Sequence, residues 1–175
     1  MRIRVLAAAA ALGGAGLAQA ALMNGQTVDY LYFFPDAATP YEYAPNGQYL
    51  VGEGVEIVDF VDFGGGRIDL SDTRLTLTFA DLELDPTSFN GFRLGDVHGR
   101  IPAFVSVTVD EASTVSFSPS RLRHDDDYIW VNLAALRFTA GQQLVLNVSA
   151  APEPGTWALM GTGLLALAAV ARRRR

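Results

Sequence analysis

The densest group of polar side chains in this 175-residue sequence is His124-Asp125-Asp126-Asp127, directly before a predicted strand. Calcium takes about six to eight hard oxygen ligands, so the carboxylates of Asp125, Asp126 and Asp127 could contribute to a calcium site. The alternating D-x-[DN]-x-[DN]-G pattern of familiar calcium loops is absent here. Two interpretations therefore remain open, a calcium site and a solvated acidic turn, and no other cofactor is expected.

A second acidic set, Asp81, Glu83 and Asp85, alternates along the chain. Alternating residues of a strand share one face, so we expect these side chains on the solvent face of a strand. Glycan hydrolysis needs two carboxylates at a set separation, but many pairs could be named in so acidic a chain. The acidic residues therefore do not single out a hydrolase site.

The remaining catalytic residue types are scarce. The sequence contains no cysteine and no lysine, which excludes thiol and Schiff-base chemistry. Its two histidines, His98 and His124, cannot complete a three-histidine zinc site, and no G-x-S-x-G motif accompanies them. We therefore predict that the protein is not an enzyme.

Aromatic residues offer a route to sugar binding, because their faces can stack on sugar rings. The pairs Tyr30/Tyr32 and Tyr128/Trp130 each fall on one face of a predicted strand. Aromatic side chains also fill the cores of β-proteins, so core packing is the alternative. Three further tyrosines that could join such a surface are Tyr41, Tyr43 and Tyr49.

The elements that would position these residues are strands. Apolar residues alternate with polar ones in Leu75-Thr76-Leu77-Thr78-Phe79, which is typical of a half-buried strand. Predicted strands recur about every ten residues with Gly, Pro and Asn turns between them, which favours an antiparallel β-sandwich, jelly-roll or Ig-like, in one domain over residues 21–150. A closed barrel is the alternative. The predicted strands cover residues 28–34, 49–60, 67–70, 74–79, 91–94, 104–109, 115–117, 128–133 and 144–148.

Charge is divided unevenly along the chain. Residues 21–150 contain 18 acidic residues and 7 arginines, a net charge of −11. Such a domain repels phosphate backbones, so we expect no nucleic-acid partner.

The first twenty residues form a predicted signal peptide. Arg2 and Arg4 precede an apolar run, and Ala18 and Ala20 supply the small residues of an A-x-A cleavage site. We therefore expect the secretion machinery and signal peptidase as partners, and a mature chain that begins at Ala21.

Residues 151–175 form a predicted sorting and membrane segment. Pro152-Glu153-Pro154 precedes an uncharged stretch at about residues 156–171, and Arg172, Arg173, Arg174 and Arg175 follow. A helix over that stretch would be about 24 Å long, slightly short of a hydrocarbon core of about 30 Å. The arginines should stay in the cytoplasm and the domain outside it.

This order of a Pro-Glu-Pro triplet, a short apolar helix and a terminal arginine cluster resembles the PEP-CTERM sorting signal. The family's pattern usually has Val before the first proline, where this chain has Ala151. The resemblance implies a Gram-negative bacterium that makes exopolysaccharide, and recognition of Pro152, Glu153 and Pro154 by the membrane enzyme exosortase, which is thought to cleave near the triplet.

Together these features predict an exported surface or extracellular-matrix protein, held at the inner membrane in transit and delivered to the cell surface or medium. We expect it to be non-enzymatic and associated with exopolysaccharide or biofilm. The alternatives are a carbohydrate-binding module, which predicts an exposed aromatic row, and a glycan hydrolase, which predicts a cleft with two facing carboxylates.

Overall fold

The computed structural model describes residues 22–62, 64–151, 163 and 172. Several predictions lie outside these residues, namely the signal peptide with Ala18, Ala20 and Ala21, the triplet Pro152 to Pro154, and Arg173 to Arg175. Most of the predicted helix at residues 156–171 also lies outside them. In the part of the chain that the structure describes, no helix is long and apolar enough to cross a membrane.

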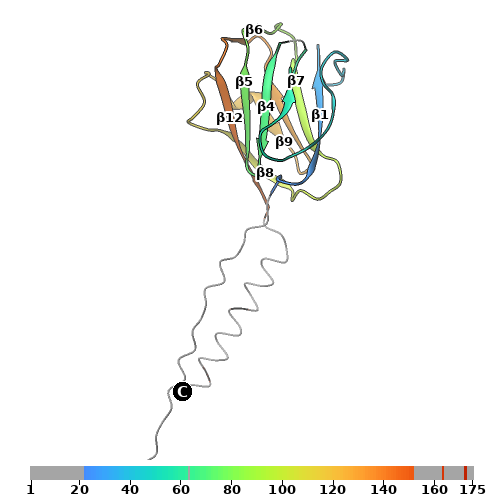
Figure 1. Ribbon diagram of the computed structural model, residues 1–175, viewed down its shortest axis with the longest axis vertical. Helices are drawn as coiled ribbons and strands as arrows, with labels where there is room; N and C mark the ends of the chain where they lie inside the picture. The colour runs from blue at the N-terminus through green and yellow to red at the C-terminus, as the bar shows by residue number, and fades with distance from the viewer. Residues whose placement is uncertain (1–21, 63, 152–162, 164–171, 173–175) are drawn as a thin grey trace, which may run out of the picture.

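The described domain is built from antiparallel strands, which confirms the all-β prediction (Figure 1). The first five-stranded sheet has the order β2-β1-β7-β10-β9. Its strands are β2 (Gly47–Leu50), β1 (Thr27–Phe33), β7 (Gly91–Asp96), β10 (Tyr128–Asn132) and β9 (Leu122–His124). A short 3-10 turn, η1 (Pro119–Arg121), leads into β9.

The second five-stranded sheet has the order β3-β4-β5-β12-β8. Its strands are β3 (Val55–Val58), β4 (Gly66–Ser71), β5 (Arg74–Phe79), β12 (Gln143–Ala150) and β8 (Phe104–Val109). A two-stranded sheet pairs β11 (Arg137–Phe138) with β6 (Leu82–Glu83).

The alternation of apolar residues explains how both large sheets bury one face. In β5, Leu75, Leu77 and Phe79 are buried while the residues between them are partly exposed. In β7, Phe92 and Leu94 are buried in the same way. The two inner faces contribute to one hydrophobic cluster, and each fully buried large side chain stabilises the fold by about 1.5–3 kcal/mol.

Two of the predicted strands differ in the structure. The predicted strand at residues 49–60 is divided between β2 and β3, which belong to different sheets. Gly54 lies between them with φ of 98°, a conformation that a strand does not use and that glycine adopts without strain. Residues 115–117 form a loop, although Phe117 is buried against the core. Burial here comes from a loop that folds back, which an apolar run alone does not reveal.

The direction of β12 places the C-terminal boundary of the described domain at one end of the sheets (Figure 1). The last described residue of the domain, Ala151, donates a backbone hydrogen bond to Ala103 at 2.8 Å, directly before β8. Phe104 in turn donates to Asp126, so the start of β10 lies at this same end. The end of β10 at Asn132 therefore lies at the opposite end of the sheet.

Candidate functional site

Tyr128 and Trp130 lie on the outer face of the first sheet, the face turned away from the core. Their neighbours Ile129 and Val131 are fully buried on the inner face. The register places Trp130 opposite Arg93 on one side and opposite Arg123 on the other. A row of two arginines and one tryptophan therefore crosses three adjacent strands.

The arginines of this row pack on aromatic rings. The guanidinium carbon of Arg123 lies 4.2 Å from the centroid of the Trp130 ring, and that of Arg93 lies 4.4 Å from the Tyr128 ring. Arg93 also lies 5.7 Å from the ring of Phe33. Cation–π contacts of this kind stabilise the arrangement and hold each guanidinium plane in place.

Glycine in the central strand makes room for this layer. The outward positions of β7 are Gly91, Arg93 and Gly95, so two of its three outward residues have no side chain. A Cβ on Gly95 would lie 2.6 Å from Cε1 of Tyr128. The Tyr128 ring therefore occupies space that only glycine leaves free.

Beside this row, the surface is hollowed into an open pocket of about 400 Å³, which we call the arginine pocket. Its size falls within the range of about 300–1,000 Å³ that is usual for small-molecule sites. It is lined by side chains from β1, β7, β9 and β10 and from three connecting segments: Phe33, Ala37, Ala38, Phe89, Arg93, Ser120, Arg121, Leu122, Arg123, Trp130 and Asn132.

The arginine pocket concentrates positive charge in an acidic domain. Among the described residues that line it, three are arginines and none is acidic. Arg93 pairs with Asp29 at 3.3 Å, and its Nε is buried without a hydrogen-bond partner among the described protein atoms. Arg121 donates to the backbone carbonyls of Asn132 and Ala134. Within the described residues, neither Arg121 nor Arg123 has a carboxylate partner, so their charge is open to an anion.

The other predicted aromatic pair, Tyr30 and Tyr32, does not form an exposed surface, which corrects that part of the sugar-binding hypothesis. Both side chains are 0% exposed and face the core. Their hydroxyls donate to the Phe60 carbonyl at 2.5 Å and to Asn90 Oδ1 at 2.7 Å. Burial raises the pKa of both phenols well above the ordinary value of 10.0, so they stay neutral hydrogen-bond donors.

The acidic residues 125–127 serve the local backbone. Oδ1 of Asp125 accepts hydrogen bonds from the backbone N–H groups of Asp127 at 3.0 Å and Tyr128 at 2.8 Å. This Asx-type turn directs the chain into β10. Among the described residues, no group of three or more His, Asp or Glu side chains is placed to hold a metal ion. The geometry thus gives the calcium interpretation no support.

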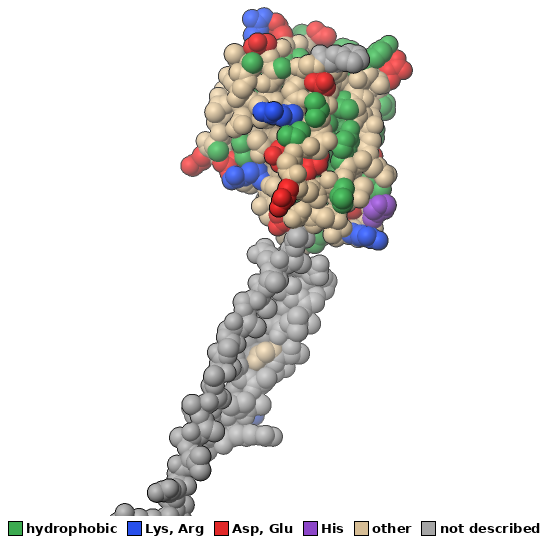
Figure 2. Space-filling model, viewed as in Figure 1, with side chains coloured by type: hydrophobic (Ala, Val, Ile, Leu, Met, Phe, Trp, Pro, Cys, Tyr) green, Lys and Arg blue, Asp and Glu red, His purple; other side chains and the backbone are tan. Residues whose placement is uncertain are grey.

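The second acidic set lies on the surface, as predicted, but of its three residues only Glu83 belongs to a strand, β6. Asp81, Glu83 and Asp85 are exposed, Glu83 pairs with Arg137, and Asp81 accepts a hydrogen bond from the backbone of Ala140. Acidic side chains are scattered over the face shown in Figure 2, around a band of hydrophobic ones.

The two histidines lie apart from any catalytic grouping in the described structure. His98 is exposed between β7 and β8, whereas His124 ends β9 and is partly buried. No ring nitrogen of either is hydrogen-bonded to a serine or a carboxylate within the described residues, and Nδ1 of His124 is buried without a partner there. This arrangement does not resemble a nucleophile and base.

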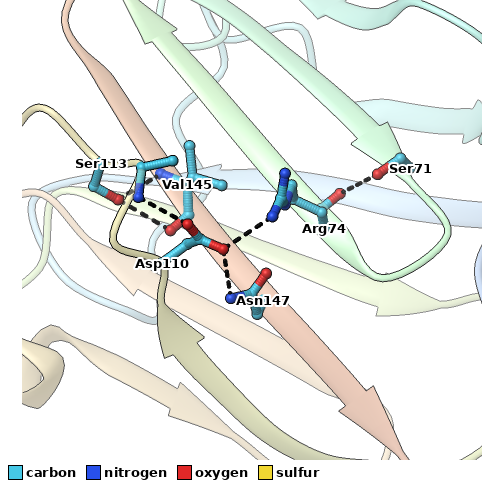
Figure 3. Close-up of polar contacts among 7 residues, drawn as sticks. Ser71, Arg74, Asp110, Ser113, Val145 and Asn147 are labelled. Atoms are coloured by element: carbon cyan, nitrogen blue, oxygen red, sulfur yellow. Dashed lines mark hydrogen bonds and ion pairs between the residues drawn. The ribbon is translucent and has the colours of Figure 1, made fainter.

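The outer side of the second sheet carries a different kind of polar group, in which the charges satisfy one another (Figure 3). Asp110 accepts from the backbone of Ala112 at 2.8 Å, from Asn147 at 2.7 Å and from Arg74 at 2.9 Å. The backbone hydrogen bond from Ala112, followed by that from the Asn147 amide and by Arg74, lowers the pKa of the Asp110 carboxyl. These hydrogen bonds connect the end of β8 to β5 and β12.

Sequence reasoning missed the three arginines of the pocket. Arg121 and Arg123 are noticeable in the sequence only as neighbours of the acidic run, and Arg93 lies about thirty residues away. The available signal was the short separation of Arg121-Leu122-Arg123 from Tyr128-Ile129-Trp130, which suits a hairpin with both sets on one face.

Taken together, the described part of the molecule is an antiparallel β domain with a cationic, aromatic pocket on one outer face. A family model of the PEP-CTERM protein-sorting motif matches residues 150–175, so the chain carries this motif directly after β12. The motif indicates an exported protein that an exosortase sorts to the cell envelope or surface. No curated protein and no solved structure matches the chain.

Proposed function

We propose that this chain is a non-enzymatic surface or extracellular-matrix protein of a Gram-negative bacterium, associated with exopolysaccharide or biofilm. The observation that carries the proposal is the PEP-CTERM motif at residues 150–175, which begins where β12 ends at Ala150. A β-sandwich of the jelly-roll or Ig-like type would be the exported part, in keeping with the two five-stranded sheets.

The order of processing follows from the two terminal segments. Signal peptidase would cleave after Ala20, and the apolar segment at about residues 156–171 would hold the chain in the inner membrane with the domain outside. Two prolines keep a peptide extended, so Pro152-Glu153-Pro154 would be presented at the membrane face for exosortase. A segment slightly shorter than the hydrocarbon core suits an anchor that is later removed.

A non-enzymatic role is favoured by how the acidic groups are used. Asp110 and Asp125 bind backbone N–H groups, and Glu83 pairs with Arg137. A glycan hydrolase needs two carboxylates facing each other across its cleft, and the described lining of the arginine pocket contains none. Asp62, Glu83 and Asp85 line a second hollow of only about 170 Å³, and there Glu83 is paired with Arg137.

The second candidate is a carbohydrate-binding module. It is favoured by one observation, the partly exposed Tyr128 and Trp130 beside a pocket of about 400 Å³. The two candidates are compatible, because a matrix protein can hold its polysaccharide through such a site.

The sorting part of the proposal is tested in the native host by replacing Pro152, Glu153 and Pro154 together with alanine. The wild-type chain should be recovered from the surface or medium. Its mass should equal that of a chain that begins at Ala21 and lacks Arg172 to Arg175. The triple variant should still be exported but should keep these arginines and remain in the inner membrane.

The matched control replaces an exposed proline and an exposed glutamate of the domain, as Pro86→Ala with Glu111→Ala. This control should be processed like the wild type. Delivery of the triple variant to the surface with its tail removed would show that the triplet is not the recognition element.

A further inference from the structure

The arginine pocket contains positive charge that the carboxylates of the described residues do not fully neutralise. Three of the seven arginines of residues 21–150 line one pocket, although the same residues carry a net charge of −11. In an acidic domain, arginines without carboxylate partners would gain by pairing with the nearest Asp or Glu. Arg123 instead lies over Trp130, and Arg121 is bound to two backbone carbonyls. Both are held where an incoming anion can meet them.

The geometry of Arg123 suits a planar anion. A guanidinium stacked on an aromatic ring keeps the N–H donors in its plane free, and those donors match the two oxygens of a carboxylate. Arg123 is exposed, so this edge is accessible from solvent. Bidentate pairs of this kind are stronger and more directional than hydrogen bonds between neutral groups.

The rest of the lining suits a sugar ring more than a simple ion. Phe89 and Trp130 present partly exposed aromatic surface, onto which the C–H face of a pyranose can pack. Ser120, whose hydroxyl lies 2.8 Å from that of Ser118, adds a polar group of the kind that binds hydroxyls. An inorganic anion would use the arginines alone and would leave the exposed parts of the Phe89 and Trp130 rings in water.

The position of the pocket suits an extended polymer outside the cell. It lies beside the Phe33 and Asn132 ends of their strands, and the register joins both of these residues to Gly91. Ala151, from which the sorting segment continues, lies at the other end of the sheet. A chain held at its C-terminal end would therefore present the pocket away from the attachment point.

We propose that the arginine pocket binds a uronic acid residue of an acidic polysaccharide. The carboxylate pairs with Arg123, and the sugar ring packs against Trp130 and Phe89. This assignment deepens the carbohydrate-binding candidate and rests on it for the class of ligand. It predicts that the protein selects acidic over neutral polysaccharide.

The test measures binding of tetragalacturonate to the purified full chain in a non-ionic detergent, by titration calorimetry. Fully methyl-esterified tetragalacturonate is the matched probe, because it keeps the rings and loses the charges. Poly-glutamate supplies carboxylates without sugar rings. We expect the acidic sugar to bind at least about tenfold more tightly than either control, since charge-assisted hydrogen bonds are lost with one and ring packing with the other.

The variant Arg123→Gln should weaken tetragalacturonate binding by about tenfold or more and should leave the melting temperature near that of the wild type, because this side chain is exposed. The matched control is Arg67→Gln, which removes an exposed arginine from the second sheet. It should bind as the wild type does.

Three results would overturn the assignment. Equal binding of the esterified sugar would remove the role of charge, equal binding of poly-glutamate would make the pocket a general anion site, and no binding of any probe would mean that it is not a ligand site. Each is distinguishable from failure of the sorting proposal, which is measured by processing in cells and not by binding to the purified chain.

Discussion

Two aromatic pairs with the same spacing lie on opposite faces of the first sheet. Tyr30 and Tyr32 in β1 are fully buried, and both hydroxyls are hydrogen-bonded inside the domain. Tyr128 and Trp130 in β10 are partly exposed and carry arginines against their rings. β7 lies between the two strands and contributes to both faces, with Phe92 inside and Arg93 outside.

The difference teaches how to separate a structural aromatic from one that can bind. Both hydroxyls of the inner pair are hydrogen-bonded to the protein, so these side chains need no partner from outside. The outer pair is surrounded by arginines whose charge the described protein does not fully compensate. A surface with unpaired charge is a candidate site, whereas the Asp110 group on the other sheet, with its charge satisfied, has a structural role.

The largest effect should come from truncating the inner pair. Tyr30→Ala removes a fully buried ring from the core, and we expect the free energy of unfolding to fall by about 3–5 kcal/mol. The matched change in the outer pair, Trp130→Ala, should cost less, because that ring is already partly in water. Chemical denaturation of the full chain measures both, and equal losses would break the comparison.

A smaller loss of stability is expected at alkaline pH. The folded-state pKa of Tyr30 and Tyr32 lies above the value of 10.0 that we take for the unfolded chain. Their contribution to stability is therefore complete below pH 10 and is lost as the pH rises through the folded-state pKa. The free energy of unfolding should fall by about 1.4 kcal/mol per tyrosine for each pH unit above 10.

Denaturation at a series of pH values from 8 to 11 would check this. Tyr32→Phe should make the alkaline slope less steep, because one phenol no longer titrates. Tyr43→Phe is the control for the loss of one phenol hydroxyl outside the core, since Tyr43 is 65% exposed. An unchanged slope in Tyr32→Phe would indicate that the inner pair is accessible to water.

The smallest loss of stability is expected from a substitution at Gly95, which lies beneath the ring of Tyr128. Gly95→Ala would place a Cβ 2.6 Å from Cε1 of Tyr128, so the ring must shift. We expect a loss of about 1 kcal/mol in stability together with weaker tetragalacturonate binding. Gly47→Ala in the same sheet is the control, because its nearest neighbour would be 3.9 Å away. If Gly95→Ala leaves binding unchanged, Tyr128 does not shape the pocket.

Much of the fold could be predicted from local pattern. The alternation in β5 reports directly which residues are buried, because the period of two is a property of the strand itself. The division of residues 49–60 between two sheets could not be predicted, since the same types of apolar residue occur in strands and in the turns that join them. Only the positive φ at Gly54 and the pairing of β2 with β1 reveal the break.

The candidate site was only half predictable. Spacing placed Tyr128 and Trp130 on one face of a strand, but it placed Tyr30 and Tyr32 in the same way. The arginines joined the site through the register of β7 and β9 with β10, which brings Arg93 and Arg123 to either side of Trp130. Register is a property of paired strands and is not written in the spacing of either one.

The sequence by itself determined the sorting motif, because the family model matches residues 150–175 as a linear pattern, which needs no partner segment. It also determined the all-β, antiparallel class, because alternation is local. The tertiary structure alone decided which aromatic pair faces the core and which faces solvent. A strand presents two equivalent faces, and only packing against the second sheet distinguishes them.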